Sequence, residues 1–221
     1  APWVDEYGLA VRVAGQLPVP PSELLSAREV RRLDPATQCA LIAARQAWAQ
    51  AFGPTAQVDP ERLAVSFSPG MGCVTTVMDA WDTLRTKGPR RVAPTTVPAL
   101  MPNAPAATLA MEFTACAGAH APVSACASGA EAISYGADLI RLGRADVVVA
   151  GGCDDALHPL TVAAFAAMRA LSTNPDPAGA CRPFASDRDG FVLGQGAGAL
   201  VLEAESYAKA RGAKILAYLD G

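Results

Sequence analysis

Hydrophobic and polar positions follow two different periods along the chain. Short apolar runs rich in β-branched residues are typical of strands, and apolar residues spaced three and four apart are typical of helices. Strands are predicted at 63–68, 146–150 and 199–203, with further candidates at 9–14, just before Cys126, and at 213–219. Helices are predicted at 26–33, 34–52, 74–85, 95–113, 128–142, 159–170 and 206–211. Because the two types alternate, we expect an α/β protein with a largely buried sheet.

Prolines and capping residues indicate where some of these helices begin or break. The segment 95–113 is expected to be a kinked or interrupted helix because it contains prolines at 98, 102 and 105. The helix that runs to Phe52 is expected to be capped by Asp34 or Thr37, whose side-chain oxygens can accept from the first free N–H groups.

Glycines and loop residues give a second set of boundaries. Gly151 and Gly152 are expected to end the strand at 146–150. The run Gly194-Gln-Gly-Ala-Gly198 lacks the spacing and context of a dinucleotide site, so we interpret it as close strand packing. The long loop 171–190 is expected to be held by ion pairs among Arg182, Asp187, Arg188 and Asp189.

The most informative stretch is Ala121-Pro-Val-Ser-Ala-Cys-Ala-Ser-Gly-Ala130. It predicts a short strand, a sharp turn at Cys126 and a helix from Ser128 to about Leu142, since small residues let the backbone turn tightly. At a helix N-terminus the N–H groups and the helix dipole favour a thiolate, which is a nucleophile. The same N–H groups can receive the oxyanion formed when it attacks a thioester. The alternative is a buried structural cysteine.

Five motifs occur in a fixed order around this stretch. They are Ser124-Ala-Cys-Ala-Ser-Gly129, Ala145-Asp-Val-Val-Val-Ala-Gly-Gly152, Arg169-Ala-Leu-Ser-Thr173, Arg182-Pro-Phe184 and Asp187-Arg-Asp-Gly-Phe-Val-Leu-Gly194. Together they closely resemble the amino-terminal half of the β-ketoacyl-[acyl-carrier-protein] synthases, and most of all the bacterial and actinobacterial elongation synthases. The resemblance covers essentially the whole chain.

The resemblance implies a thiolase-like fold, layered α-β-α-β-α in the complete subunit. Residues 1–221 would be the amino-terminal domain, without the first strand and helix and without the carboxy-terminal half, which supplies the catalytic histidines and lysine. The implied reaction is condensation of an acyl group on Cys126 with malonyl-acyl-carrier protein, releasing CO2. Such a homodimeric acyltransferase would act in fatty-acid elongation, and this fragment alone would be inactive.

The resemblance also implies roles for residues away from the cysteine. Met71 and Phe165 fall where similar synthases line the acyl pocket, although both are also ordinary core residues. Four arginines fall where similar synthases hold the acidic carrier protein, although a solvated helix face is the alternative for most of them: Arg28, Arg31, Arg32 and Arg169. His120 does not match a catalytic histidine of the family and is interpreted as structural or surface-exposed.

Composition narrows the classes of function. Hydrophobic residues make up 51% and charged residues 18% of the chain, which is typical of a protein with a substantial core. A net charge of −3 without a basic run argues against general nucleic-acid binding. Ala, Gly and Pro interrupt every hydrophobic run, so no membrane span is expected.

The cysteines indicate a compartment rather than a metal site. The six, at 39, 73, 116, 126, 153 and 181, show neither CxxC nor zinc spacing, and only two histidines accompany them. Free thiols in a reducing cytoplasm are the simplest interpretation, and we expect neither a metal nor another cofactor.

Other functions remain compatible with these residues. A polyketide ketosynthase would share the motifs, and a thiolase relative would share the fold and the cysteine but would use coenzyme A. The arginines favour a carrier protein over coenzyme A. A non-catalytic chain-length-factor-like subunit usually lacks the cysteine, so Cys126 argues against that class.

Overall fold

The computed structural model describes residues 3–53 and 58–220. By its internal contacts the chain divides into two compact units. The larger unit contains residues 21–154 and 196–221, and the smaller one contains residues 1–20 and 155–195. Each unit has a core of its own and is described by itself.

A four-stranded sheet in the order β2-β1-β3-β4 is the centre of the larger unit. Its strands are β1 (Leu63–Pro69), β2 (Gly118–His120), β3 (Val147–Asp155) and β4 (Gln195–Glu203). The strand β1 pairs in parallel with both β2 and β3, and its pairing with β3 runs from Leu63 opposite Val147 to Pro69 opposite Cys153. All seven residues of β1 are buried, as expected for a parallel strand covered on both faces.

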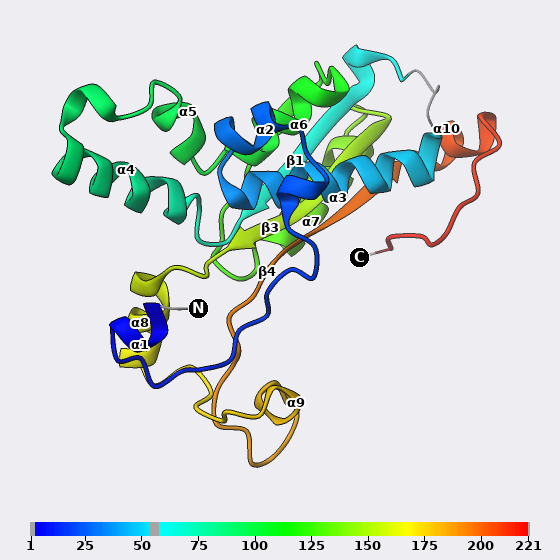
Figure 1. The fold of residues 1–221 in the computed structure, drawn as a ribbon. Helices are drawn as coiled ribbons and strands as arrows, with labels where there is room; N and C mark the ends of the chain where they lie inside the picture. Colours follow the sequence, from blue (N-terminus) through cyan, green and yellow to red (C-terminus); the bar gives the residue numbers. More distant parts are fainter. Residues whose placement is uncertain (1–2, 54–57, 221) are drawn as a thin grey trace. The chain divides into compact units, whose positions relative to one another are not determined.

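Helices cover the two faces of this sheet (Figure 1). On one face, Val65, Phe67 and Val149 pack in a core with α3 (Pro35–Phe52) and α6 (Ala104–Phe113). On the other face, Ala64 and Val148 pack with Leu139 of α7 (Ser128–Arg141). The side chains of each strand alternate between these two cores. The predicted α/β architecture with a buried sheet is therefore confirmed.

The larger unit also contains shorter helices and the longer helix α4. They are η1 (Pro21–Glu23), α2 (Ala27–Arg32), η2 (Pro60–Arg62), α4 (Val74–Lys87), η3 (Pro89–Arg91), α5 (Thr96–Leu100) and α10 (Glu205–Ala210). The predicted interruption of 95–113 is confirmed, since α5 ends before Pro102 and α6 begins anew at Ala104. None of the helices in the described ranges is long and apolar enough to cross a bilayer.

Asp34 joins two of these helices. One carboxylate oxygen accepts from the Ala36 N–H at 2.9 Å and caps α3, which decides between the two predicted caps. The other oxygen accepts from the Thr76 N–H at 3.1 Å and from its hydroxyl at 2.7 Å. This buried carboxylate therefore fixes the start of α3 against the first turn of α4.

The smaller unit contains short helices and a long loop. Its helices are α1 (Trp3–Glu6), α8 (Pro159–Ala167) and α9 (Pro177–Ala180), and its core contains Val11, Val162 and Leu171. The predicted ion pairs of the loop are confirmed in part, because Arg182 lies 3.7 Å from Asp187 and 3.5 Å from Asp189. Arg188 instead donates to the Ala185 carbonyl at 3.0 Å.

Four strand predictions were wrong. Residues 9–14 form no strand, and only a single bridge between Gly15 and Gly194 follows them. The strand before Cys126 is earlier than predicted, at Gly118–His120, because Pro122 lacks an N–H for a ladder. The segment 213–219 forms no strand in the described part of the chain.

The fourth wrong prediction was that Gly151 and Gly152 end their strand. β3 continues through both to Asp155. Glycine is needed there because a Cβ on Gly151 would lie 2.0 Å from the Gly198 carbonyl oxygen of β4. The glycines therefore permit close packing within the sheet rather than a turn, as we had expected for the run 194–198.

Candidate active site

The turn before α7 holds its shape through a set of short internal hydrogen bonds. Ala125 adopts a left-handed backbone conformation, with φ at 51°, which residues other than glycine seldom adopt. The Ala127 N–H donates to the Ser124 carbonyl at 3.1 Å, and the Ser128 N–H donates to the Ala125 carbonyl at 3.0 Å. The buried Ser128 hydroxyl also donates to the Ala125 carbonyl at 2.6 Å and accepts from the Ser124 N–H at 2.9 Å.

This turn places Cys126 two residues before the first residue of α7. The thiol is exposed, and the predicted helix start at Ser128 is confirmed. The helix has 14 residues, so its N-terminal partial positive charge faces the region of the thiol. The N–H groups of Ala127 and Ser128 already donate within the turn, and that the N–H of Cys126 donates to an oxyanion stays a prediction.

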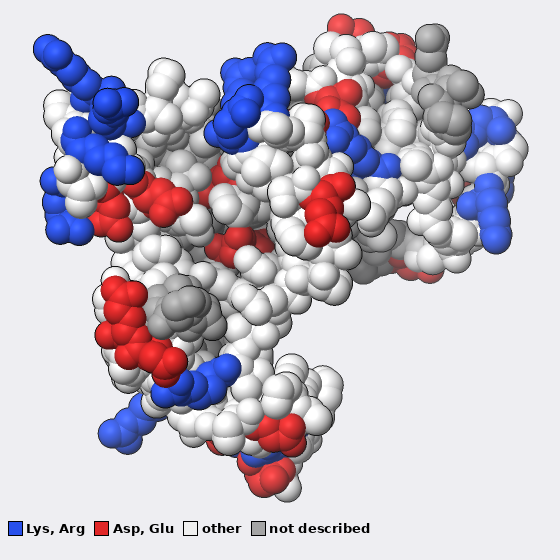
Figure 2. Space-filling model, in the orientation of Figure 1, with Lys and Arg blue, Asp and Glu red and all other residues white. Residues whose placement is uncertain are grey.

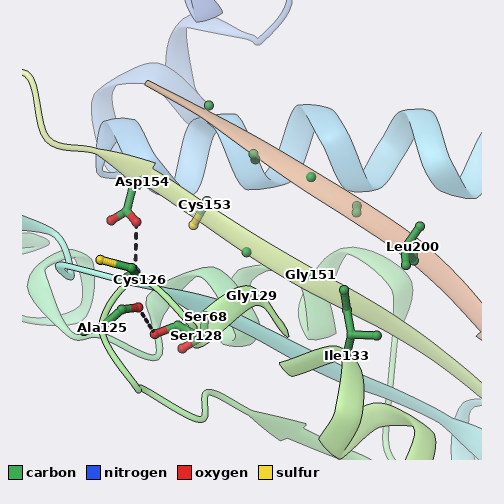
Figure 3. Close-up of a pocket in the computed structure, with 16 residues that line it drawn as sticks. Ser68, Ala125, Cys126, Ser128, Gly129, Ile133, Gly151, Cys153, Asp154 and Leu200 are labelled. Atoms are coloured by element: carbon green, nitrogen blue, oxygen red, sulfur yellow. Dashed lines mark hydrogen bonds between the residues drawn. The ribbon is translucent and has the colours of Figure 1, made fainter. Parts of the chain in front are cut away.

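Cys126 lines a pocket of about 640 Å³ within the larger unit. The pocket is lined by the end of β1, the turn after it, the first turn of α7, and parts of β3 and β4. Figure 3 shows Asp154 and Cys153 of β3 across from Cys126 and Ser128. Glycines and alanines form much of the lining, with Ile133 and Leu200 at its apolar end. An acyl thioester needs such a combination of a polar turn and an apolar cavity.

The other thiols differ from Cys126 in burial or in position. Burial, with a smaller contribution from Asp34, raises the pKa of Cys73 to about 12. Burial also raises the pKa of Cys153 well above its ordinary value, so neither thiol ionises near neutral pH. Cys116 and Cys181 are exposed but do not line the pocket. Cys126 is therefore the exposed thiol of this pocket.

Met71 and Phe165 lie in different units. Met71 follows the end of β1, is 40% exposed, and is absent from the residues that line the pocket. Phe165 belongs to α8 of the smaller unit, where its ring meets the edge of Phe191 at 5.3 Å between centroids. Their shared role in an acyl pocket stays a prediction.

Basic side chains gather over α2 and over the segment from the end of α4 to η3 (Figure 2). Arg28, Arg31 and Arg32 are exposed, as is Arg169 in the smaller unit. Within the described ranges, none of these four arginines forms an ion pair with a carboxylate. That the four form one patch stays a prediction.

A protein-family model identifies the family to which this chain belongs. The model described as "Beta-ketoacyl synthase, N-terminal domain" matches residues 8–208, which is most of the chain. The chain belongs to the β-ketoacyl synthase family. The predicted family is thereby confirmed, and the left-handed turn with an exposed cysteine is its nucleophile candidate.

Curated relatives are 3-oxoacyl-[acyl-carrier-protein] synthases 2. The one from Mycobacterium tuberculosis is 43% identical over 222 aligned positions, covering 100% of this chain and 53% of the relative. One from Staphylococcus aureus is 38% identical, covering 99% of this chain and 54% of the relative. The chain therefore spans about half the length of the curated relatives that it matches.

Solved structures of ketosynthases share the fold. A β-ketoacyl synthase from Burkholderia phymatum has a TM-score of 0.81 at 31% identity, covering 96% of this chain and 53% of that one. A type II polyketide ketosynthase, in complex with its acyl-carrier protein and bound to a hexaketide, has a TM-score of 0.78 at 27% identity, with coverages of 96% and 51%. The predicted thiolase-like fold is confirmed by these neighbours.

Two polar residues that line pockets of the larger unit were not predicted from the sequence. Asp154 lines the pocket, and Arg91 lines a second pocket of about 310 Å³ together with Arg31 and Arg32. The only sequence signal for Asp154 is its place near the carboxyl end of a buried strand, where parallel strands carry functional residues. Arg91 lies in a short basic run after α4 that we had not interpreted.

We predict that iodoacetamide alkylates Cys126 first among the six thiols of the native protein. Its thiol is exposed at the start of α7, whereas burial raises the pKa values of Cys73 and Cys153 and keeps those two thiols protonated at neutral pH. Peptide mass mapping after brief labelling measures the order. Cys116 and Cys181 serve as exposed thiols without a long helix behind them, and labelling of either ahead of Cys126 would contradict the assignment.

Proposed function

We propose that the protein is a β-ketoacyl-[acyl-carrier-protein] synthase of fatty-acid elongation and that this chain supplies its nucleophile. The observation that carries the proposal is the exposed Cys126 thiol at the start of α7, in a turn with a left-handed residue and in the lining of a pocket that has an apolar end. The similarity to synthases 2 at 43% identity supports this choice of reaction.

The first step is transfer of an acyl group to the cysteine. The Cys126 thiolate attacks the carbonyl carbon of an acyl-carrier-protein thioester, a new C–S bond forms, and the carrier thiolate leaves. The charge that develops on the carbonyl oxygen is stabilised by the N–H of Cys126 and by the dipole of α7. The hydrogen bonds of the Ser128 hydroxyl fix the backbone of this turn, so the thiol and the N–H of Cys126 keep a constant position relative to each other.

The second step forms the carbon–carbon bond. A malonyl-carrier protein loses CO2, and the resulting enolate attacks the acyl-cysteine carbonyl, releasing the Cys126 thiolate and a β-ketoacyl product. The resemblance assigns the two histidines and the lysine of this step to positions beyond those matched here. The described residues supply the nucleophile and part of the oxyanion site, so we expect acyl transfer chemistry to depend on them and condensation to need more.

We predict that Cys126→Ser lowers acyl transfer by more than about 10³-fold, because a serine hydroxyl at neutral pH is a far weaker nucleophile than a thiolate. The measurement is the mass shift of the full-length natural protein after incubation with an acyl thioester. The small change in volume should leave the melting temperature within a few degrees of the parent value. The matched control is Cys116→Ser, an exposed thiol outside the pocket. Acylation of Cys126→Ser at the parent rate would contradict the proposal.

Met71 and Phe165 are proposed to limit the acyl chain. We predict that Phe165→Ala shifts the preferred acyl length upward, since it removes a ring from the proposed pocket wall. Phe165 is half-buried, so the loss of stability should stay below the roughly 3–5 kcal/mol of a fully buried phenylalanine. Product lengths read by mass spectrometry measure the shift.

The control for this variant is Phe191→Ala, which breaks the same ring contact from the other side. A shift in acyl length for Phe165→Ala alone would support the pocket role. If both variants lose only stability and keep the parent length profile, Phe165 is a core residue.

An acyl-carrier protein is the proposed partner, and a cytoplasmic homodimer is the proposed form of the enzyme. The support is chemical: a positive cluster on a protein of net charge −3 attracts an acidic partner and raises its association rate. One solved ketosynthase of similar fold is in complex with its acyl-carrier protein, which agrees with this partner class. Arg28, Arg31, Arg32 and Arg169 are the proposed docking residues.

We predict that Arg28→Glu, Arg32→Glu and Arg169→Glu each raise KM for a carrier-bound substrate severalfold, with a weaker salt dependence than in the parent enzyme. Activity on a small pantetheine thioester should barely change, because that substrate makes no protein contact. Arg141→Glu, on the exposed last turn of α7, is the matched control. Equal losses on both substrates would show that these arginines support the fold or the pocket instead.

A polyketide ketosynthase is the second candidate, since two solved structures with TM-scores of 0.78 and 0.74 belong to polyketide or chain-length-factor systems. The lower identity of these neighbours, 27% and 25%, favours the fatty-acid assignment. A single extension per acyl group, rather than several on the same chain, would distinguish the two in the acyl-length measurement above.

A further inference from the structure

Asp154 holds the turn that follows β1 through both oxygens of its carboxylate. One oxygen accepts from the Gly70 N–H at 3.0 Å, and the other accepts from the Met71 N–H, also at 3.0 Å. Two consecutive N–H groups that converge on one carboxylate fix the orientation of both peptide planes. The backbone that carries Met71 is therefore tied to β3, 83 residues further along the chain.

The Gly70–Met71 turn also lies against the turn before α7, residues 124–128, here named the nucleophile turn. A Cβ built on Gly70 would lie 2.7 Å from the Asp154 carboxylate and 3.0 Å from the Ala125 carbonyl oxygen. That carbonyl also accepts from the N–H and the hydroxyl of Ser128, so it is a fixed part of the nucleophile turn. Gly70 thus lies between the carboxylate and the residue directly before Cys126, with no room for a side chain.

We propose that Asp154 is a positioning residue that holds the Gly70–Met71 turn against the nucleophile turn and thereby sets where the Met71 side chain stands. The proposal rests on the proposed function, in which Met71 limits the acyl chain. Asp154 acts through the backbone of Met71 in this scheme. The length of the acyl group that Cys126 accepts therefore depends on Asp154.

The chemistry of the contact predicts which substitutions preserve it. Asp154→Asn leaves one acceptor oxygen and places an NH2 group against an N–H donor, so it breaks one of the two bonds. Asp154→Glu keeps two acceptor oxygens on a longer arm and should restore part of the function. Asp138→Asn, on the exposed surface of α7, removes a carboxylate elsewhere and is the matched control.

The experiment compares acylation of Cys126 in the full-length natural protein by short-chain and long-chain acyl-pantetheine thioesters. Asp154→Asn is expected to change the ratio of the long-chain to the short-chain rate at least about tenfold, because a released Met71 side chain no longer sets the same limit, with Asp154→Glu between it and the parent. Iodoacetamide should still alkylate Cys126 in this variant, which checks that the thiol stays accessible to a reagent without an acyl chain. An unchanged preference for acyl length in Asp154→Asn would overturn the proposal.

A double-mutant cycle separates positioning from direct contact with substrate. If Asp154 acts through Met71, Asp154→Asn should change the length preference far less in a Met71→Ala background. An equal change in both backgrounds would overturn the proposal. If Asp154→Asn does not fold, the same cycle with Asp154→Glu decides in the same way. Failure of the proposed function would look different, because the parent protein itself would then form no acyl-cysteine from either thioester.

Discussion

The parallel pairing of β1 with β3 is the constraint on which the candidate site depends. Parallel strands present their carboxyl ends at one edge, and this pairing extends as far as Pro69 opposite Cys153. The turn carrying Gly70 and the carboxylate of Asp154 are therefore neighbours by register, whatever the length of chain between them. The helix α7 covers one face of the same strands and brings Cys126 to that edge.

Most of this arrangement could be predicted from the sequence, because the signals are local. The β-branched run at 147–149 is a buried strand, and the small residues around Cys126 predict the turn and the start of α7. The glycine pair at 151 and 152 was misinterpreted, since a sequence shows a missing side chain but not the backbone that occupies its space. Asp154 was missed for a related reason: the Gly70 and Met71 groups that it accepts from are more than 80 residues away, and both are main-chain groups.

Selectivity among the thiols follows from solvation as much as from position. Cys153 lines the same pocket as Cys126, yet burial keeps its proton in place, and Cys73 is similarly protonated near the end of β1. Desolvation disfavours a thiolate that gains no compensating charge or dipole. A site with several cysteines can therefore present one nucleophile, provided that only one of them is both exposed and placed before a helix.

The start of α7 lies against β3 with no side chain between them. A Cβ on Gly152 would lie 2.9 Å from the Gly129 Cα, and the two glycines line the pocket together. This part of the pocket lining consists of main-chain atoms alone, so its shape depends little on which side chains surround it. A change in what this pocket accepts therefore has to come from the part of its lining that carries side chains, such as Ile133 and Leu200.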